Sequence, residues 1–193
     1  MLTILALTLA TALASPVGAD SPAAAATAPA RFEVAERLRM NLGGDSGQYT
    51  NWARDDLARF DGFSTTVRID DIHGKPGDKW AASARINLLG AGEGESRARV
   101  SLVFMVDRKT RQLSAAWSAG KDLPWKAFDV ALSMQKPIEV KVVPDAPGKL
   151  HVEIGESIFT VDDDVDIKAI EVSGSGLDVS FVPFLLLRRV DAQ

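Results

Sequence analysis

Residues 137–161, PIEVKVVPDAPGKLHVEIGESIFTV, alternate apolar and polar side chains on both sides of a short turn. Successive side chains of a β-strand point to opposite faces of the sheet, so this period of two predicts a hairpin with one buried face. The segment PDAPG at 144–148 provides the proline and glycine of the turn. The row expected to face the core is Ile138, Val140, Val142, Leu150, Val152 and Ile154. The row expected to face solvent is Glu139, Lys141, His151 and Glu153.

The same alternation recurs on both sides of this hairpin. Further alternating segments cover residues 63–69, 80–88, 98–106, 113–117, 128–134, 158–161, 167–173 and 177–187. Turn sequences such as HGKPGD and DRKTRQ separate them. Trp80 and Trp117 fall on apolar rows, and we expect both in the core. This regular spacing predicts an all-β fold, an antiparallel two-sheet jelly-roll-type sandwich of about ten strands.

Two segments before residue 63 are ambiguous. Residues 32–42 alternate like a strand, but Phe32, Leu38 and Leu42 also fit the 3.6-residue period of a helix. We expect a strand there. The segment NWARDDLARF at 51–60 could form one helical turn capped by Asn51.

Composition narrows the class of protein. The chain has 193 residues, which indicates a single domain with a sizeable core. Its net charge is −4, and both signs are scattered along the sequence, so we expect no nucleic-acid partner. The absence of cysteine excludes disulfides, thiolate metal sites and cysteine nucleophiles.

The first 19 residues, MLTILALTLATALASPVGA, contain no charged side chain. The apolar run at 2–13 has the length of a signal peptide, and Val17 and Ala19 are small residues at the −3 and −1 positions of a cleavage site. We expect a signal peptide at 1–19, an Ala/Pro-rich linker at 20–30 and one β-sandwich domain at 31–193. A buried N-terminal helix is the alternative. After cleavage the protein would be periplasmic or secreted, and not integral to the membrane.

The second half of the chain resembles a known sandwich family. The segments FDVALSMQKPIEVKVVPDAPGKLHVEIGESIFTV (128–161) and IKAIEVSGSGLDVSFVPFLLL (167–187) resemble the strand order of concanavalin A-like (laminin-G-like) β-sandwiches. The resemblance covers about residues 63–187 and implies a curved double sheet, often used to bind glycans. It carries over no functional residue, because the Glu-x-Asp-x-x-Glu strand of the catalytic glycosidases of this fold does not occur here.

Aromatic residues in loop-like segments are the candidate ligand-binding residues. They are Tyr49, Trp52 and Trp125. Aromatic side chains at such places can stack on sugar rings or line a hydrophobic opening. The alternative is that each covers one end of the sandwich.

Carboxylates are the candidate metal ligands. In DDDVD at 162–166, the side chains of Asp162, Asp164 and Asp166 could converge on calcium, which prefers oxygen ligands. An acidic turn between strands is the alternative. His73 has several aspartates nearby in sequence and could serve in metal binding or acid–base chemistry, although a histidine in a polar turn is usually only solvated. The segment GDSG at 44–47 imitates a protease nucleophile segment, but both histidines follow Ser46, so we interpret it as a turn.

The expected function is non-catalytic binding by an exported protein of the bacterial envelope. A glycan or polysaccharide is the leading ligand, with no cofactor other than a possible calcium ion. The alternative is an envelope carrier of lipid or another apolar ligand, held in a cavity between the sheets. An enzyme ranks third, because no acid–base pair or nucleophile has a supporting partner in the sequence. An exposed aromatic groove would favour the glycan, and an enclosed apolar cavity the lipid.

Overall fold

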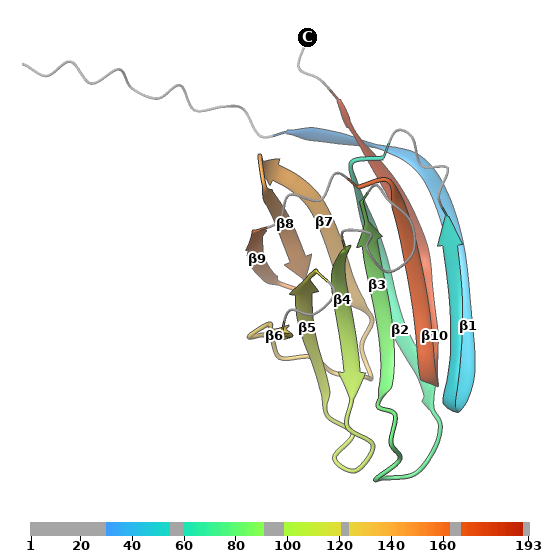
Figure 1. Ribbon diagram of the computed structural model, residues 1–193. Coiled ribbons are helices and arrows are strands. Elements are labelled where there is room, and N and C mark those ends of the chain that lie inside the picture. Colours follow the sequence, from blue (N-terminus) through green and yellow to red (C-terminus); the bar gives the residue numbers. More distant parts are fainter. Residues whose placement is uncertain (1–29, 55–59, 91–98, 121–123, 163–166, 191–193) are drawn as a thin grey trace, which may run out of the picture.

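The computed structural model describes residues 30–54, 60–90, 99–120, 124–162 and 167–190 (Figure 1). These residues form strands, turns and irregular segments without a helix, so the all-β prediction is confirmed. The expected signal peptide lies outside the described residues. The strands are β1 Arg31–Arg54, β2 Gly62–Ile72, β3 Ala82–Leu89, β4 Arg99–Val106, β5 Leu113–Ala119, β6 Lys126–Ala127, β7 Ile138–Ala146, β8 Lys149–Ile154, β9 Ser157–Asp162 and β10 Ala169–Val190.

Strand β10 belongs to both layers of the sandwich. Residues 169–175 of β10 pair with β3, and residues 177–187 pair with β2. The first layer is therefore β6-β5-β4-β3 with the first part of β10, and the second layer is β9-β8-β7-β2 with its second part. Between the two parts lies Gly176, whose φ of +62° suits glycine. A Cβ atom there would also collide with the guanidinium of Arg108.

Strand β1 follows β10 along both layers. It pairs antiparallel with β10 from Arg31 opposite Val190 to Arg54 opposite Ile170. Figure 1 shows the two long strands side by side along one edge of the molecule. Residues 32–42 are thus a strand, as expected, and not a helix.

One hydrophobic cluster fills the space between the layers. Its largest fully buried side chains include Phe63, Phe104, Phe181 and Phe184, each with 0% exposure. The rings of Phe63 and Phe184 stack with their centroids 5.2 Å apart. The members come from both layers, so the layers share a single core.

The predicted hairpin forms with β7 and β8 as its two strands, but its turn is shorter than the expected 144–148, because β7 continues to Ala146 and only Pro147 and Gly148 form the turn. All six residues of its expected inward row are buried. In the outward row, the Glu153 carboxylate accepts a hydrogen bond from Lys141 Nζ at 2.9 Å and pairs with His151 Nε2 at 2.9 Å. The bond from Lys141 is the main reason why the pKa of Glu153 is lowered. These contacts leave the three side chains half-buried rather than fully exposed.

Two local predictions are wrong. Residues 51–54 continue β1 instead of forming a helical turn, because the partner residues 170–173 of β10 extend the ladder there. Residues 128–134 keep the predicted alternation of burial, but within this segment no strand forms. Their apolar side chains pack on the core from an extended chain, and the ring of Phe128 lies 4.5 Å from that of Phe159 in β9. The segment thereby links the first layer to the second on the side away from β10.

Candidate functional site

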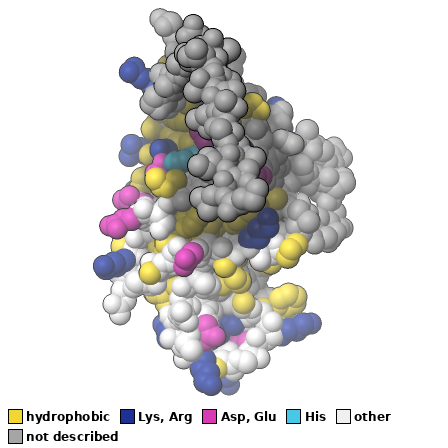
Figure 2. Space-filling view, turned by 90° about the vertical axis from the view of Figure 1, so that its left-hand side faces the viewer, with side chains coloured by type: hydrophobic (Ala, Val, Ile, Leu, Met, Phe, Trp, Pro, Cys, Tyr) yellow, Lys and Arg dark blue, Asp and Glu magenta, His cyan; other side chains and the backbone are white. Residues whose placement is uncertain are grey.

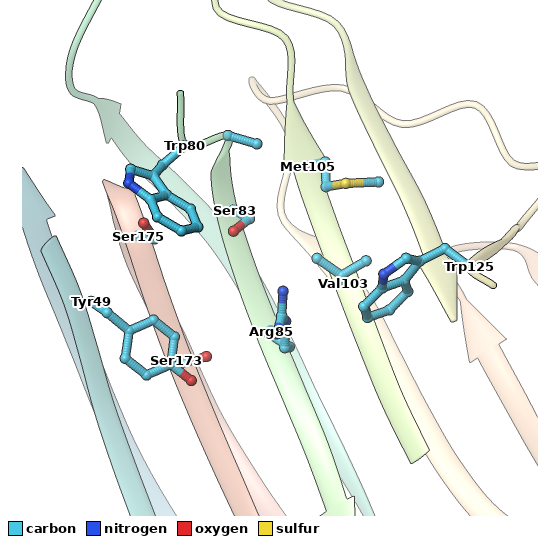
Figure 3. Close-up of a pocket in the computed structure, with 10 residues that line it drawn as sticks. Tyr49, Trp80, Ser83, Arg85, Val103, Met105, Trp125, Ser173 and Ser175 are labelled. Atoms are coloured by element: carbon cyan, nitrogen blue, oxygen red, sulfur yellow. The ribbon is translucent and has the colours of Figure 1, made fainter. Parts of the chain in front are cut away.

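The outer face of the first layer carries a groove with a volume of about 300 Å³ (Figure 3). This size lies at the lower end of the range for ligand pockets, about 300–1,000 Å³. We call it the aromatic groove. It is lined by Tyr49, Trp80, Ala81, Ser83, Arg85, Val103, Met105, Trp125, Ser173 and Ser175.

The alternation of three neighbouring strands builds the floor. In β3, Ala82, Ala84 and Ile86 point into the core, so Ser83 and Arg85 point outward. Cross-strand pairing places Ser173 and Val103 on either side of Arg85, and Ser175 and Met105 on either side of Ser83. The floor is therefore hydroxyl-bearing on the β10 side and apolar on the β4 side.

Three aromatic rings stand around this floor. Tyr49 is 55% exposed, Trp80 57% and Trp125 44%. Figure 3 shows Tyr49 and Trp80 on one side of Arg85 and Trp125 on the other. These three rings surround one groove, and a contiguous exposed apolar patch often marks a binding site. The groove therefore offers stacking surfaces at both sides of a polar centre.

The structure brings together two of the three aromatic residues singled out in the sequence. Tyr49 and Trp125 both line the groove, and their role in ligand binding stays a prediction. Trp52 does not line it, because the alternation of β1 turns its side chain onto the core. Trp80 was expected in the core, which is wrong: β3 begins only at Ala82, so Trp80 precedes the ladder and lies exposed. Its position immediately after Lys79, which follows the turn sequence HGKPGD, is the signal that could have shown this.

A hydrogen-bond chain fixes the Tyr49 side of the groove. The Tyr49 hydroxyl donates to Glu171 Oε1 at 3.2 Å, and Asn87 Nδ2 donates to the same oxygen at 2.7 Å. Ser101 Oγ in turn donates to Asn87 Oδ1 at 2.7 Å. Partial burial raises the pKa of Tyr49, so its hydroxyl remains a donor at neutral pH. The chain connects four strands, β1, β10, β3 and β4, on the outer face.

Arg108 holds the segment that carries Trp80. Its Nε donates to the backbone oxygen of His73 at 2.7 Å, and its Nη1 donates to the backbone oxygen of Trp80. Its Nη2 reaches Ser46 Oγ at 3.4 Å, and Ser46 donates to Asp78 Oδ2 at 2.7 Å. The bond from Ser46 is the main reason why the pKa of Asp78 is lowered. The hydroxyl of the GDSG segment thus serves to position the β2–β3 connection.

The described residues settle only part of the expected calcium site. Asp162 is exposed at the end of β9, where its Oδ1 lies 3.9 Å from Lys149 Nζ. Asp164 and Asp166 lie outside the described residues, so calcium binding at 162–166 stays a prediction.

A second group of potential metal ligands lies where β2 ends beside β10. One ligand atom each of Asp71, His73 and Asp178 lies within 4.8 Å of the others. One nitrogen and two oxygens suit a divalent transition metal better than calcium. However, His73 Nε2 already pairs with Asp178 Oδ1 at 3.0 Å, and this bond raises the pKa of His73. Asp71 accepts a hydrogen bond from the backbone nitrogen of Ile72, so these contacts account for the cluster without an ion.

Comparison of the sequence with known proteins gives no match: no family model fits the chain, and no curated protein matches it. Within the described ranges there is no helix that could cross a bilayer.

Solved structures with a similar fold exist. One is a variant fructofuranosidase from Schwanniomyces occidentalis complexed with fructosylnystose, at a TM-score of 0.55 and 9% identity over 83% of this chain. The present chain spans about a third of that enzyme, 34% of its length. A second is Scytalido-glutamic peptidase, at a TM-score of 0.50 and 13% identity over 74% of each chain. A third is a carbohydrate-binding module from Bacillus subtilis, at a TM-score of 0.48 and 7% identity over 83% of this chain and 97% of the module.

The fold is of the concanavalin A-like kind. The resemblance of the strand pattern had implied this fold, and the likeness to solved structures bears it out at the level of architecture. At such low identity the likeness concerns the fold alone, since one fold supports many functions.

Proposed function

We propose that the protein binds a carbohydrate in the aromatic groove and does not transform it. The observation that carries the proposal is the exposure of Tyr49, Trp80 and Trp125 around a polar floor. The C–H faces of a sugar ring pack on aromatic rings, and its hydroxyls need hydrogen-bond partners. Ser83, Ser173 and Arg85 offer such partners. A fructofuranosidase of similar fold complexed with an oligosaccharide is consistent with this ligand class.

The alternative of a lipid carrier has less support. It calls for an enclosed apolar cavity between the layers. In the described part of the chain, that space is filled by fully buried side chains such as Phe63, Phe104 and Phe181. The groove lies on the outer face instead, and its floor carries polar groups.

Replacing the groove aromatics tests the proposal. Trp80→Ala and Trp125→Ala should each weaken carbohydrate binding about tenfold, because each removes one stacking surface worth roughly 1–1.5 kcal/mol. The measurement is isothermal titration with the best ligand from an array of cell-envelope and plant glycans. The free energy of unfolding should change little, since both side chains are exposed.

The matched control is Ile158→Ala. Ile158 is 67% exposed on β9, in the second layer, and its loss should leave binding unchanged. Parent protein that binds nothing on the array, or groove variants that bind as well as the parent, would contradict the proposal.

We also infer that the protein is exported to the periplasm or secreted. The inference rests on the uncharged apolar segment at 1–19, which has the length of a signal peptide and ends in small residues. Expression in a bacterial host should give a mature protein that begins at Asp20, as determined by N-terminal sequencing of the periplasmic fraction. A full-length product that still carries Met1 in the cytoplasm would rule this out.

A further inference from the structure

Arg85 places a cation at the centre of the groove. Its side chain rises from β3 between Ser173 and Val103, and its guanidinium carbon lies 5.4 Å from the ring centre of Trp125 (Figure 3). Among the residues that the structure describes, no carboxylate forms an ion pair with it. Its Nε atom is buried and has no hydrogen-bond partner within the same residues.

A neighbouring hydroxyl is also unsatisfied. Ser173 lies opposite Arg85 in the β3–β10 ladder, and its buried Oγ has no hydrogen-bond partner in the described part of the chain. Ser173 lies near the Tyr49 hydroxyl and can donate to its ionised form, which opposes the rise of the Tyr49 pKa, while the neutral hydroxyl donates to Glu171. Buried polar groups in proteins are nearly always hydrogen-bonded, because an unmade bond costs about 1–3 kcal/mol. The guanidinium of Arg85 lines the open groove and has no ion-pair partner among the described residues, so it indicates a place that an acceptor fills.

Glu171 does not provide that acceptor. It lies on the same face of β10, but its Oε1 already accepts from Asn87 Nδ2 and from the Tyr49 hydroxyl. The carboxylate is thus held toward the Tyr49 side, while Arg85 leans toward Trp125. The positive charge of Arg85 therefore remains available to a ligand.

The face of the molecule shown in Figure 2 is not uniformly basic. On the face shown in Figure 2, Lys and Arg side chains are interspersed with Asp and Glu. The net charge of the whole chain is −4. An attraction for anions would therefore be local to Arg85 rather than a property of the whole protein.

We propose that the carbohydrate of this groove is an acidic one, whose anionic group binds the guanidinium of Arg85 beside Trp125. The proposal rests on carbohydrate binding in the groove. A planar guanidinium donates two parallel N–H bonds to an oxyanion, and such charge-assisted pairs are roughly twice as strong as neutral hydrogen bonds. The carboxylate of a uronic acid and a sulfate ester share this chemistry. A sugar ring that carries either group would stack on Trp125 while its anion reached Arg85.

Matched ligands separate charge from sugar shape. Oligogalacturonate and its methyl ester share the same sugar chain but differ in the carboxylate charge and one methyl group on each esterified carboxyl, and dextran sulfate and dextran differ in the sulfate. Isothermal titration at low salt should show the parent binding at least one acidic member about ten or more times more tightly than its neutral counterpart. The preference should decrease as salt is added, because salt screens exposed charges.

Variants of two basic residues then test whether Arg85 causes the preference for the acidic ligand. Arg85→Gln should reduce the ratio of acidic to neutral affinity to near one. Lys149→Gln makes the same change in net charge on β8, in the second layer, and should keep the ratio of the parent. Circular dichroism and urea unfolding of both variants establish that they are folded.

The outcomes are distinguishable. Equal affinity of the parent for both members of each pair, or an undiminished ratio in Arg85→Gln, would overturn the acidic-ligand proposal. In that case binding that still depends on Trp125 would leave the wider carbohydrate proposal standing. Parent protein that binds none of the four ligands and nothing on the glycan array would overturn both. Preference for oligogalacturonate alone identifies the anion as a carboxylate, and preference for dextran sulfate alone identifies it as a sulfate.

Discussion

Phe184→Ala should lower the free energy of unfolding by about 3–5 kcal/mol, the range for removing a fully buried phenylalanine. Phe184 has 0% exposure and stacks on Phe63 at 5.2 Å. It lies in the second part of β10, paired with Leu38 of β1 on one side and Thr65 of β2 on the other. Its loss would leave a cavity where three strands meet. Urea unfolding followed by tryptophan fluorescence measures the change.

The neighbouring residue provides the control for this experiment. Leu185 points to the opposite face of β10 and is only partly buried, so Leu185→Ala should cost clearly less. A loss of about 5 kcal/mol can unfold a marginally stable domain, and in that event Phe184→Leu should show a smaller loss in the same direction. Equal losses for Phe184→Ala and Leu185→Ala would mean that the core does not lie where the structure places it.

Gly62→Ala should destabilise the protein by about 1–3 kcal/mol, at the upper end of that range, because the added methyl group has no space. Gly62 begins β2, and a Cβ atom there would collide with the backbone oxygen of Val142. It would also lie 2.9 Å from Val143 Cγ1 and 3.0 Å from Val143 Cα. Relief would require the β2 and β7 backbones to separate, at the start of the ladder between them. The melting temperature and the urea midpoint should both decrease.

Gly44→Ala is the matched control for Gly62. A Cβ at Gly44 would meet the side-chain oxygen of Thr50 at 3.2 Å, and atoms of Gln48 at 3.6 Å. A side chain can adjust to such a contact at small cost, so this variant should lose less stability than Gly62→Ala. If both variants lose the same amount, the close approach of β2 to β7 is not the cause.

The sequence predicted burial better than it predicted pairing. The alternation at 128–134 is correct as a burial pattern, since alternate side chains pack on the core, but none of the described strands includes this segment. Alternation indicates which side of an extended chain faces the core. It does not indicate whether the backbone pairs with a neighbouring strand. The pairing of β7 with β8 was predicted correctly, although the turn is shorter than expected, because a turn between two alternating segments also determines the partner of each strand.

The groove could be predicted only through its aromatic residues. Tyr49 and Trp125 were noticeable as large rings in loop-like segments, whereas Ser83, Arg85 and Ser173 belong to ordinary alternating strands. That Arg85 points outward follows from its place between Ala84 and Ile86. That it meets Trp125 and Ser173 depends on the register of β3 with β4 and β10, which no local pattern contains.

The pairing of β1 with β10 has a mechanical consequence. Arg31 lies opposite Val190, so the chain enters and leaves the described fold at the same end of one antiparallel ladder. A pulling force applied at these two points loads the hydrogen bonds one pair at a time, starting at that end, instead of shearing the whole ladder at once. Tyr49 and Ser175 are paired much farther along it. Under tension the groove would therefore keep its floor while the outer pairs separate.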